Sequence, residues 1–310
     1  MTINFLYDII KTGESMDKIL SLKIDPSLDG KTVKYILQTC LGLSAALITQ
    51  LKQADDGIML SGERVFVNKR VCESDELVIT IADGTSDIPE GEIPLDILYE
   101  DEDIIAVNKP RNMPTHPSQN HYEDTLANGL MYYYKGKNFT FRAITRLDRD
   151  TSGVVLIAKN PLSATILGDD MKRGKIHKEY AAIVCGSPDP KKGRIDAPIR
   201  RFKESVILRC VSPDGKDAVT DYETVSTANN IALVRLFPKT GRTHQLRVHL
   251  SHIGTPIYGD DLYGAPQKDE NVRLHCQKII FTHPLTKNEM VLTAPLPNDM
   301  TDLIEKEISK

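Results

Sequence analysis

The chain has 310 residues, of which 40% are hydrophobic and 26% charged, an ordinary composition for a globular protein. At about 100–200 residues per domain, this length predicts two domains. No stretch approaches the ~20 apolar residues of a membrane span, and the first residues lack the pattern of a secretion signal. We therefore expect a cytoplasmic protein with no membrane partner.

Cysteine and histidine usage gives no sign of a metal centre. An odd, scattered set of cysteines without a CxxC pair predicts buried, reduced thiols. His244, His249 and His252 lie close together, but that segment holds no acidic or cysteine partner at ligand spacing. We expect neither disulfides nor a metal. The cysteines are Cys40, Cys72, Cys185, Cys210 and Cys276.

The net charge of −4 is unevenly distributed along the chain. Residues 13–82 carry 8 basic and 10 acidic side chains, residues 83–104 carry 9 acidic and no basic ones, and residues 105–310 carry 30 basic and 23 acidic ones. The basic C-terminal part permits a polyanionic partner through phosphate contacts. A solvated surface with a chance excess of cations explains the charge equally well.

Residues 83–96 are rich in Gly, Pro, Ser and acidic side chains, the composition of a linker. They separate a first unit, 13–82, from a second unit, 97–300. In the first unit we predict helices at 16–22, 33–40 and 45–52, the last with Ser44 as its N-cap. A hairpin around Ser61-Gly62 and a strand at 76–81 follow. The first unit therefore reads as helices followed by a small hairpin sheet.

The second unit opens with two strand-like runs between residues 97 and 110, which flank an acidic turn. Further strands are predicted at 153–159, 178–185, 218–226 and 231–237. A helix is predicted from Pro161 to about Arg173, because proline is favoured at the first helical position. Strands dominate without regular βαβ alternation, which favours a mixed α/β or α+β sheet over a doubly wound one.

A run of polar residues at 145–152 leads directly into the predicted strand at 153–159. A loop at the end of a sheet strand can hold a reactive carboxylate in place. The residues alone favour a plainer interpretation, in which Asp148 and Asp150 cap backbone N–H groups of a turn.

A second segment, 239–254, predicts a helix with Thr243 as N-cap and Gly254 just beyond its end. At 100° per residue, Leu246, Leu250 and Ile253 form a stripe that should face the core, while His244, Arg247 and Ser251 share another face. An arginine in that position can reach an anionic group in a cleft. It can equally lie over apolar surface with its charge in water.

Both segments resemble the RluA-type pseudouridine synthases. Residues 145–153 (TRLDRDTSG) are similar to the family pattern HRLDxxTSG, and residues 241–249 match GRTHQLRVH without change. Residues 107–117 resemble VxNKPxGxxVHP, and residues 178–186 resemble KxYxAxVxG. The motifs occur in family order over about residues 95–297. The resemblance implies an α+β fold with a mixed, mainly antiparallel sheet, and an enzyme that isomerises uridine in RNA.

The resemblance also implies roles for individual residues. Asp148 would carry the bond-breaking step, and Arg247 would be the cation that keeps it ionised. Tyr180 would stack on the flipped base, and Arg146 would fill the gap that the base leaves. Further RNA or base contacts are expected from Thr151, His244 and Gln245. No cofactor or metal is implied, because the reaction is redox-neutral.

Two positions depart from the family pattern, since Thr145 replaces a histidine and Asn112 replaces a glycine. Asn112 can still adopt a left-handed conformation, and Thr145 should change how the loop packs. The first unit resembles an S4-like RNA-binding domain, although Lys52 is the one basic residue on its expected RNA-facing helix. Ribosomal RNA is the expected partner ahead of tRNA, and a monomer is expected.

Two other functions remain open. A non-catalytic RNA-binding or ribosome assembly factor could retain the same fold. A glycosidic hydrolase generally needs two carboxylates, and Asp150 is the sequence-near candidate for the second. Residues 148 and 150 would point apart if the loop were evenly extended, which disfavours the hydrolase.

Overall fold

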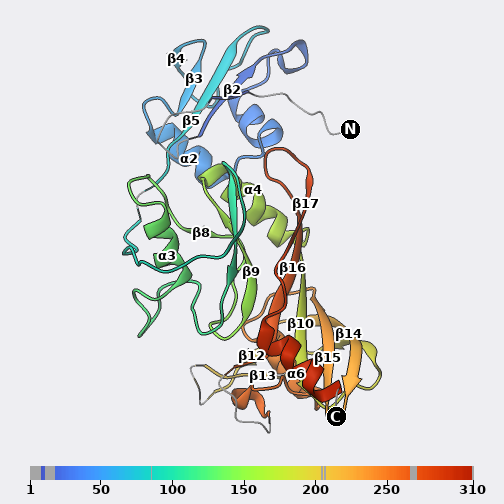
Figure 1. The fold of residues 1–310 in the computed structure, drawn as a ribbon. Coiled ribbons are helices and arrows are strands. Elements are labelled where there is room, and N and C mark those ends of the chain that lie inside the picture. The colour runs from blue at the N-terminus through green and yellow to red at the C-terminus, as the bar shows by residue number, and fades with distance from the viewer. Residues whose placement is uncertain are drawn as a thin grey trace.

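The computed structural model describes residues 8–10, 18–84, 86–203, 205, 207–265 and 271–308. Figure 1 shows the N-terminal elements stacked above one end of a long sheet, with the last helix at the opposite end. No helix among the described residues is long and apolar enough to cross a membrane.

A five-stranded antiparallel sheet organises the N-terminal part, in the order β1-β2-β5-β3-β4. Ser44 caps α2 as predicted, accepting a hydrogen bond from the Leu47 amide at 3.2 Å. The predicted helical stretch at 33–40 and the hairpin around Ser61-Gly62 are also confirmed. The strands are β1 Asp8–Ile10, β2 Lys18–Lys23, β3 Ile58–Leu60, β4 Glu63–Arg64 and β5 Glu76–Ile81. The helices are a 3-10 turn Pro26–Leu28, α1 Val33–Tyr35, a π-helical turn Ile36–Cys40 and α2 Ala45–Gln53.

The predicted helix at 16–22 is wrong where it can be checked. Residues 16 and 17 lie outside the described residues, and Lys18–Lys23 forms strand β2 between β1 and β5. Lys18, Leu20 and Leu22 are buried while the residues between them are not, which is the period of a strand and not of a helix. A strand therefore precedes the helices, and the expected order of helices followed by a hairpin is incorrect.

A ten-stranded sheet forms the larger part of the molecule. Its main path runs β11-β14-β15-β10-β16-β9-β7-β6, with β17 added on β16 and β8 on β9. All its named pairings are antiparallel except β9 with β16, so the expected mixed, mainly antiparallel sheet is confirmed. The strands are β6 Ile97–Glu100, β7 Ile104–Lys109, β8 Arg142–Ala143, β9 Ser152–Ala158, β10 His177–Cys185, β11 Lys192–Asp196, β14 Val219–Ala228, β15 Ile231–Pro238, β16 Leu274–Thr282 and β17 Glu289–Thr293.

Helices cover both faces of this sheet. On one face, α3 Leu126–Tyr133 and α5 Gln245–His252 pack their apolar side chains against β7, β9, β10 and β15. On the other face lie α4 Pro161–Lys172 and α6 Asn298–Ile308. A separate hairpin of β12 Ile199–Arg201 and β13 Arg209–Val211 extends at the end far from the N-terminal sheet (Figure 1).

The acidic connector at 83–96 is held against the second unit. Asp83 pairs with Arg142, and Glu90 pairs with Lys135 at 2.7 Å. The side-chain amide of Asn128 in α3 donates to the Pro89 carbonyl at 2.8 Å. The connector therefore neutralises part of the basic charge of the second unit instead of hanging free.

Candidate functional site

The site lies on a row of paired residues that crosses the centre of the large sheet. Lys109 of β7 is opposite Gly153 of β9, Gly153 is opposite Cys276 of β16, and Cys276 is opposite Tyr180 of β10. Directly opposed residues face the same side of a sheet. The row therefore brings the end of the 145–152 loop next to Lys109 and, across β16, within two strands of Tyr180, on the face that α3 and α5 cover.

Gly153 fixes where this loop meets the sheet. Its φ is +114°, and a Cβ built there would lie 2.2 Å from the carbonyl oxygen of Cys276. Only glycine allows that conformation and that approach of two backbones. Next to it, the Ser152 hydroxyl lies 2.9 Å from Nδ1 of buried His275. The Ser-Gly end of the motif thus joins β9 to β16 at their parallel contact.

Threonine hydroxyls hold the other end of the loop. Thr145, the residue in the family's histidine position, accepts a hydrogen bond from the Leu156 amide at 2.9 Å and is buried. Thr115 donates to the Leu147 carbonyl at 2.9 Å. The Asp148 carbonyl accepts from the Thr151 amide at 3.1 Å. A turn is therefore present in the backbone, but the predicted capping of backbone N–H groups by the Asp148 and Asp150 carboxylates is not found among the described residues. The half-buried Asp148 carboxylate is left for other partners.

The charge of Asp148 acts on five ionisable groups from separate parts of the chain. Burial is the largest influence on the pKa of each, and Asp148 contributes in every case. Burial lowers the pKa of both lysines and of the histidine and raises that of the tyrosine, whereas bonding to Asp260 raises the arginine pKa. Asp148 thus lies at the centre of the predicted site. The five groups are Lys109, Lys178, Tyr180, His244 and Arg247.

Lys109 is a component of the site to which the sequence reasoning assigned no role. It is fully buried, and its Nζ donates to the carbonyls of Pro110 at 2.8 Å, Met113 at 2.7 Å and Arg149 at 3.2 Å. Three carbonyls use the three hydrogens of an ammonium group. Burial lowers the pKa of Lys109 to about 7, against the opposing effect of Asp148 and Asp150. The Asn-Lys-Pro run at the end of a predicted strand was the available signal.

The expected ion pair between Arg247 and Asp148 is not formed. Arg247 makes two 2.7 Å hydrogen bonds to the carboxylate of fully buried Asp260 and lies 3.6 Å from Asp150. A buried carboxylate needs a bidentate partner, and the planar guanidinium supplies one. Asp148 is not among the ion-pair partners of Arg247 in the described part of the chain. It affects Arg247 through its field, as one of the charges that raise the Arg247 pKa.

Three residues predicted to share a face of α5 meet at Tyr263. His244 Nδ1 lies 2.7 Å from the Tyr263 hydroxyl, and the Ser251 hydroxyl donates to its carbonyl at 2.7 Å. The Arg247 guanidinium lies 5.1 Å from the centre of the Tyr263 ring, a cation–π distance. The expected core stripe is confirmed as well, since Leu246 and Leu250 are buried and Ile253 packs against the same cluster.

The predicted N-cap at Thr243 is wrong, and Gly254 is confirmed just past the helix end with a φ of +79°. Helix α5 is preceded by His244, whose φ of +57° is left-handed and whose side chain makes no cap bond. A non-glycine residue in this conformation is strained. The His244 ring does not cap the helix but hydrogen-bonds the Tyr263 hydroxyl through Nδ1. Asn112 also adopts a positive φ, +61°, the left-handed conformation that the sequence analysis expected it to tolerate.

The remaining predicted residues differ in how much of each side chain is available to a ligand. Tyr180 is 6% exposed, and Thr151 is 2% exposed. Arg146 is exposed and has no hydrogen-bond or ion-pair partner among the described residues. The Gln245 amide accepts from Thr240 and donates to Thr220 and to the Val219 carbonyl, so its polar atoms are committed to the protein itself.

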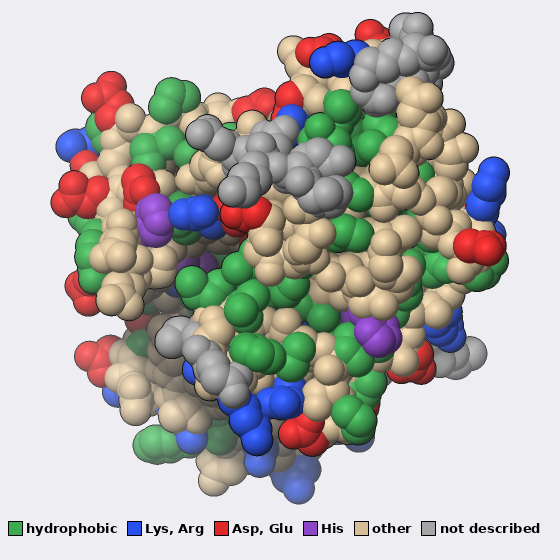
Figure 2. Space-filling view, turned by 90° about the horizontal axis from the view of Figure 1, so that it is seen from below, with side chains coloured by type: hydrophobic (Ala, Val, Ile, Leu, Met, Phe, Trp, Pro, Cys, Tyr) green, Lys and Arg blue, Asp and Glu red, His purple; other side chains and the backbone are tan. Residues whose placement is uncertain are grey.

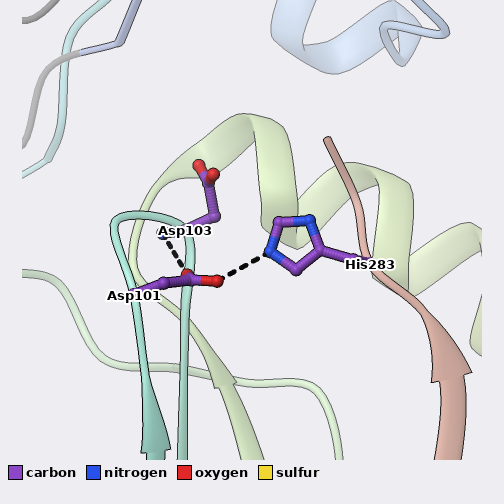
Figure 3. A group of neighbouring side chains, drawn as sticks. All are labelled: Asp101, Asp103 and His283. Carbon is purple, nitrogen blue, oxygen red and sulfur yellow. Dashed lines mark hydrogen bonds and ion pairs between the residues drawn. The ribbon is translucent and has the colours of Figure 1, made fainter. Parts of the chain in front are cut away.

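One group of side chains has the composition of a metal site. In Figure 3 the Asp101 carboxylate lies between the Asp103 backbone amide and the His283 ring. His283 Nδ1 accepts from the Leu285 and Thr286 amides, so its proton is on Nε2, which donates to Asp101 at 2.9 Å. Burial opposes ionisation of Asp101, but the hydrogen bond from His283 and those from nearby backbone amides lower its pKa.

The same group connects the two parts of the molecule. Lys18 Nζ of β2 lies 2.9 Å from the Asp103 carboxylate, and both side chains are more than nine-tenths buried. Leu162 of α4 belongs to the apolar cluster of the N-terminal sheet. His283 and the Asp103 backbone amide therefore hold Asp101 at this junction, while the Asp103 carboxylate binds Lys18. The imidazole nitrogen that faces Asp101 already carries a proton.

Comparison with known proteins agrees with this geometry. Residues 103–252 match the family model described as RNA pseudouridylate synthase. The chain is 39% identical to the uncharacterized RNA pseudouridine synthase YjbO of Bacillus subtilis over 272 residues, which cover 86% of this chain and 96% of that protein. It is 36% identical to the ribosomal large subunit pseudouridine synthase D of Haemophilus influenzae over 309 residues, covering 94% and 90%.

Among solved structures, the fold is similar to human RNA pseudouridylate synthase domain containing 4. The TM-score is 0.57 at 28% identity, with 69% of this chain and 93% of that one covered. The Asp148 loop, α5 and strands β7, β9 and β10 lie within the region matched by the family model, and β16 follows it. The chain belongs to the RNA pseudouridine synthases.

Proposed function

We propose that Asp148 is the catalytic carboxylate of this RNA pseudouridine synthase and that its substrate uridines are in ribosomal RNA. The observation that carries the first part is the position of Asp148. Its carboxylate lies in a loop anchored at both ends, and its charge reaches five ionisable groups in β7, β10, α5 and the residue that precedes α5.

The chemistry requires an ionised group at the sugar. The C1′–N1 bond of uridine breaks, a C1′–C5 bond forms, the C5 proton leaves and N1 gains a proton, so no oxidant or cofactor is consumed. A carboxylate can bond to C1′ or stabilise positive charge there, or it can remove a sugar proton. Lys109, Lys178 and Arg247 lie close enough to Asp148 for its charge to affect the pKa of each, so the carboxylate is placed among basic side chains.

Two further residues fit the handling of a flipped base. The uridine must leave the helical stack, which costs a few kcal/mol. Arg146 is exposed beside Asp148 and is not engaged by described residues, so it is available to occupy the vacated position. Tyr180 supplies an aromatic ring close enough to Asp148 for the charge of Asp148 to raise the Tyr180 pKa. The face of an aromatic ring can stack on any base. Thr151 and His244 are the further candidates for contacts with the RNA, since the Thr151 amide donates to the Asp148 carbonyl at 3.1 Å and the charge of Asp148 acts on His244.

The proposal of ribosomal RNA rests on the relatives. Several curated relatives at 32–38% identity are named ribosomal large subunit pseudouridine synthase D. The division into units 13–82 and 97–300 is supported by separate apolar clusters, one of which holds residues 20–81 together with Leu162. RNA binding by the first unit, as its S4-like pattern suggests, belongs to the same proposal.

The role of Asp148 is tested with Asp148→Asn, which removes the charge and changes little volume. We expect purified full-length variant to form no pseudouridine in RNA from cells that lack the gene, as measured by nucleoside mass spectrometry. Asp169→Asn on the surface of α4 is the matched control and should retain full turnover. Wild-type turnover by Asp148→Asn would reject the assignment. If the wild-type protein released free uracil from the RNA, its activity would instead be hydrolysis of the glycosidic bond.

The substrate is tested by mapping pseudouridine in cells with and without the gene. We expect at least one site in large-subunit ribosomal RNA to disappear and to return when the wild-type gene is restored. The Asp148→Asn gene should not restore it. Sites lost from tRNA alone would contradict the ribosomal substrate and leave the catalytic assignment standing.

A further inference from the structure

The first turn of the C-terminal helix α6 carries a carboxylate that binds two arginines from distant parts of the chain. Asp299 accepts hydrogen bonds from both terminal nitrogens of Arg111, one of them at 2.9 Å, and its carboxylate also lies 3.3 Å from Nε of Arg273. In Figure 2, which views the molecule from below, many Lys and Arg side chains lie on the surface. Arg111 and Arg273 differ from these, because their side chains are only 10% and 9% exposed.

Asp299 is thus a shared counter-ion of two buried guanidiniums. Arginine stays protonated in proteins, so without this carboxylate two positive charges would lie close together with little water to screen them. Burial opposes ionisation of Asp299, but the hydrogen bonds and charge of Arg111 and the charge of Arg273 lower its pKa. Removal of the Asp299 charge should therefore loosen both arginines at once.

Arg111 is connected to the loop that carries Asp148. It lies in the segment that follows β7, and two carbonyls of that segment, on either side of Arg111, accept hydrogen bonds from Lys109 Nζ. The same amino group donates to the Arg149 carbonyl, directly after Asp148. A displacement of Arg111 would therefore reach the residue beside the carboxylate through one amino group.

Arg273 is connected to the other side of the site. Its backbone amide donates to the Tyr258 carbonyl at 3.0 Å, and its guanidinium lies 5.8 Å from the centre of the Tyr258 ring. Tyr258 is two residues before Asp260, the carboxylate that binds Arg247. Asp299 therefore joins the support of Arg247 to the support of the reactive loop.

We propose that Asp299 is a positioning residue for pseudouridine formation. By binding Arg111 and Arg273 together, it fixes the Asp148 loop relative to the arginine of α5. The inference rests on the proposed function, because it assigns a support to the carboxylate that was proposed as catalytic. Such support matters for the rate, since a misplacement of about 1 Å can cost about 100-fold.

The test compares Asp299→Asn with Asp302→Asn in the full chain. Asp302 is an exposed residue of the same helix, so the control removes one carboxylate charge from α6 and leaves both arginine contacts in place. For RNA from cells lacking the gene, kcat should fall about tenfold or more in Asp299→Asn, while KM changes by less than about twofold. Asp302→Asn should keep both wild-type constants, and Asp299→Glu, which retains the charge, should recover part of the rate. An unchanged kcat in Asp299→Asn, or an equal loss in Asp299→Glu, would overturn the inference.

A double variant tests the route through Arg111. If Asp299 acts by holding Arg111, combining Arg111→Gln with Asp299→Asn should lower kcat by less than the product of the two single losses, because both substitutions break the same contact. Losses that multiply would show that the two residues act independently and would contradict the proposed route.

Hydrogen exchange measured by mass spectrometry gives a readout that does not depend on turnover. The Thr151 amide donates to the Asp148 carbonyl at 3.1 Å, so peptides that contain it report on the loop. These peptides should exchange faster in Asp299→Asn than in the wild type, while peptides from α4 exchange equally. Unchanged exchange in the loop, or an equal increase in α4, would contradict the positioning role even if activity were lost. Failure of the catalytic assignment is seen independently, in the turnover of Asp148→Asn.

Discussion

The Nζ of Lys109 lies 3.2 Å from the carbonyl oxygen of Arg149, the residue that follows Asp148. Through this contact the amino group of Lys109, at the end of β7, holds the loop that carries the carboxylate. Because Lys109 also binds the Pro110 and Met113 carbonyls, it ties two loops together. Its position indicates a positioning residue that keeps Asp148 in place.

Lys109→Met keeps the buried chain length but removes all three donors. We expect turnover to fall sharply, because the backbone next to Asp148 loses its anchor, while three unpaired carbonyls each cost about 1–3 kcal/mol of stability. Lys109→Arg should restore less than the wild-type activity, since a planar guanidinium cannot reproduce three convergent bonds. Pseudouridine formation under single-turnover conditions measures the effect, and undiminished turnover by Lys109→Met would refute the positioning role.

The same residue predicts a pH dependence of stability. Burial lowers the pKa of Lys109 from 10.5 to about 7, so between these values the unfolded chain binds a proton that the native protein has released. The free energy of unfolding should therefore rise with pH across this window, by about 1.4 kcal/mol per pH unit from this group. Urea unfolding of wild type and Lys109→Met at pH 7, 8 and 9 isolates the contribution. If the free energy of unfolding changed equally with pH in the two proteins, Lys109 would not make this contribution.

Asp260→Asn tests the partner that Arg247 has in the structure. The variant preserves size but leaves a guanidinium that is 3% exposed facing a neutral amide. We expect a loss of about 3–5 kcal/mol of stability and a large loss of turnover. Asp221→Asn is the control, because its partner Arg194 is 60% exposed and water screens such a pair, so its loss should change stability little. Equal urea midpoints for the two variants would show that breaking the buried ion pair destabilises the protein no more than breaking the exposed one.

Gly153→Ala tests the contact between β9 and β16. The added methyl would lie 2.2 Å from the Cys276 carbonyl at a φ of +114°, so both space and conformation oppose it. We expect little folded protein, or a protein with a displaced Asp148 loop and no turnover. Gly168→Ala in α4, where no atom lies within 4 Å of the added methyl, should gain about 0.5–1 kcal/mol. The melting temperatures of both variants, each compared with that of the wild-type protein, test this prediction.

Local signals explain what the sequence could predict. Pro161 begins α4 as expected, and the apolar run after Gly153 forms β9, because capping and periodicity act over a few residues. The helix predicted over 16–22 is incorrect because the strand there requires a buried lysine, which no local pattern indicates. Lys18 can be buried only because Asp103 pairs with it, and that partner is 85 positions away in the sequence.

The site shows the same limit. Its motifs identified Asp148, Tyr180 and Arg247 from residue types in order, and the structure brings these into one electrostatic cluster. The carboxylate that Arg247 binds depends on how the loop after α5 returns, which no spacing within the motif specifies. The pairing of Asp260 with Arg247 was therefore not assigned from the sequence. The three carbonyls around Lys109 could not be, because backbone carbonyls carry no residue-type signal.

Substitutions of Tyr180 distinguish a role of its ring in base stacking from a chemical role of its hydroxyl. Burial, with Cys276 and Asp148 nearby, raises the pKa of Tyr180 well above its usual value, so the hydroxyl stays protonated and cannot act as a base at neutral pH. Tyr180→Phe keeps the ring and should retain most of kcat, with no change in the pH profile between pH 6 and 9. Tyr180→Leu keeps bulk without an aromatic face and should lose activity through weaker base stacking, worth about 1–3 kcal/mol. If Tyr180→Phe were as inactive as Tyr180→Leu while both melted at the wild-type temperature, the hydroxyl and not the ring would be the required group.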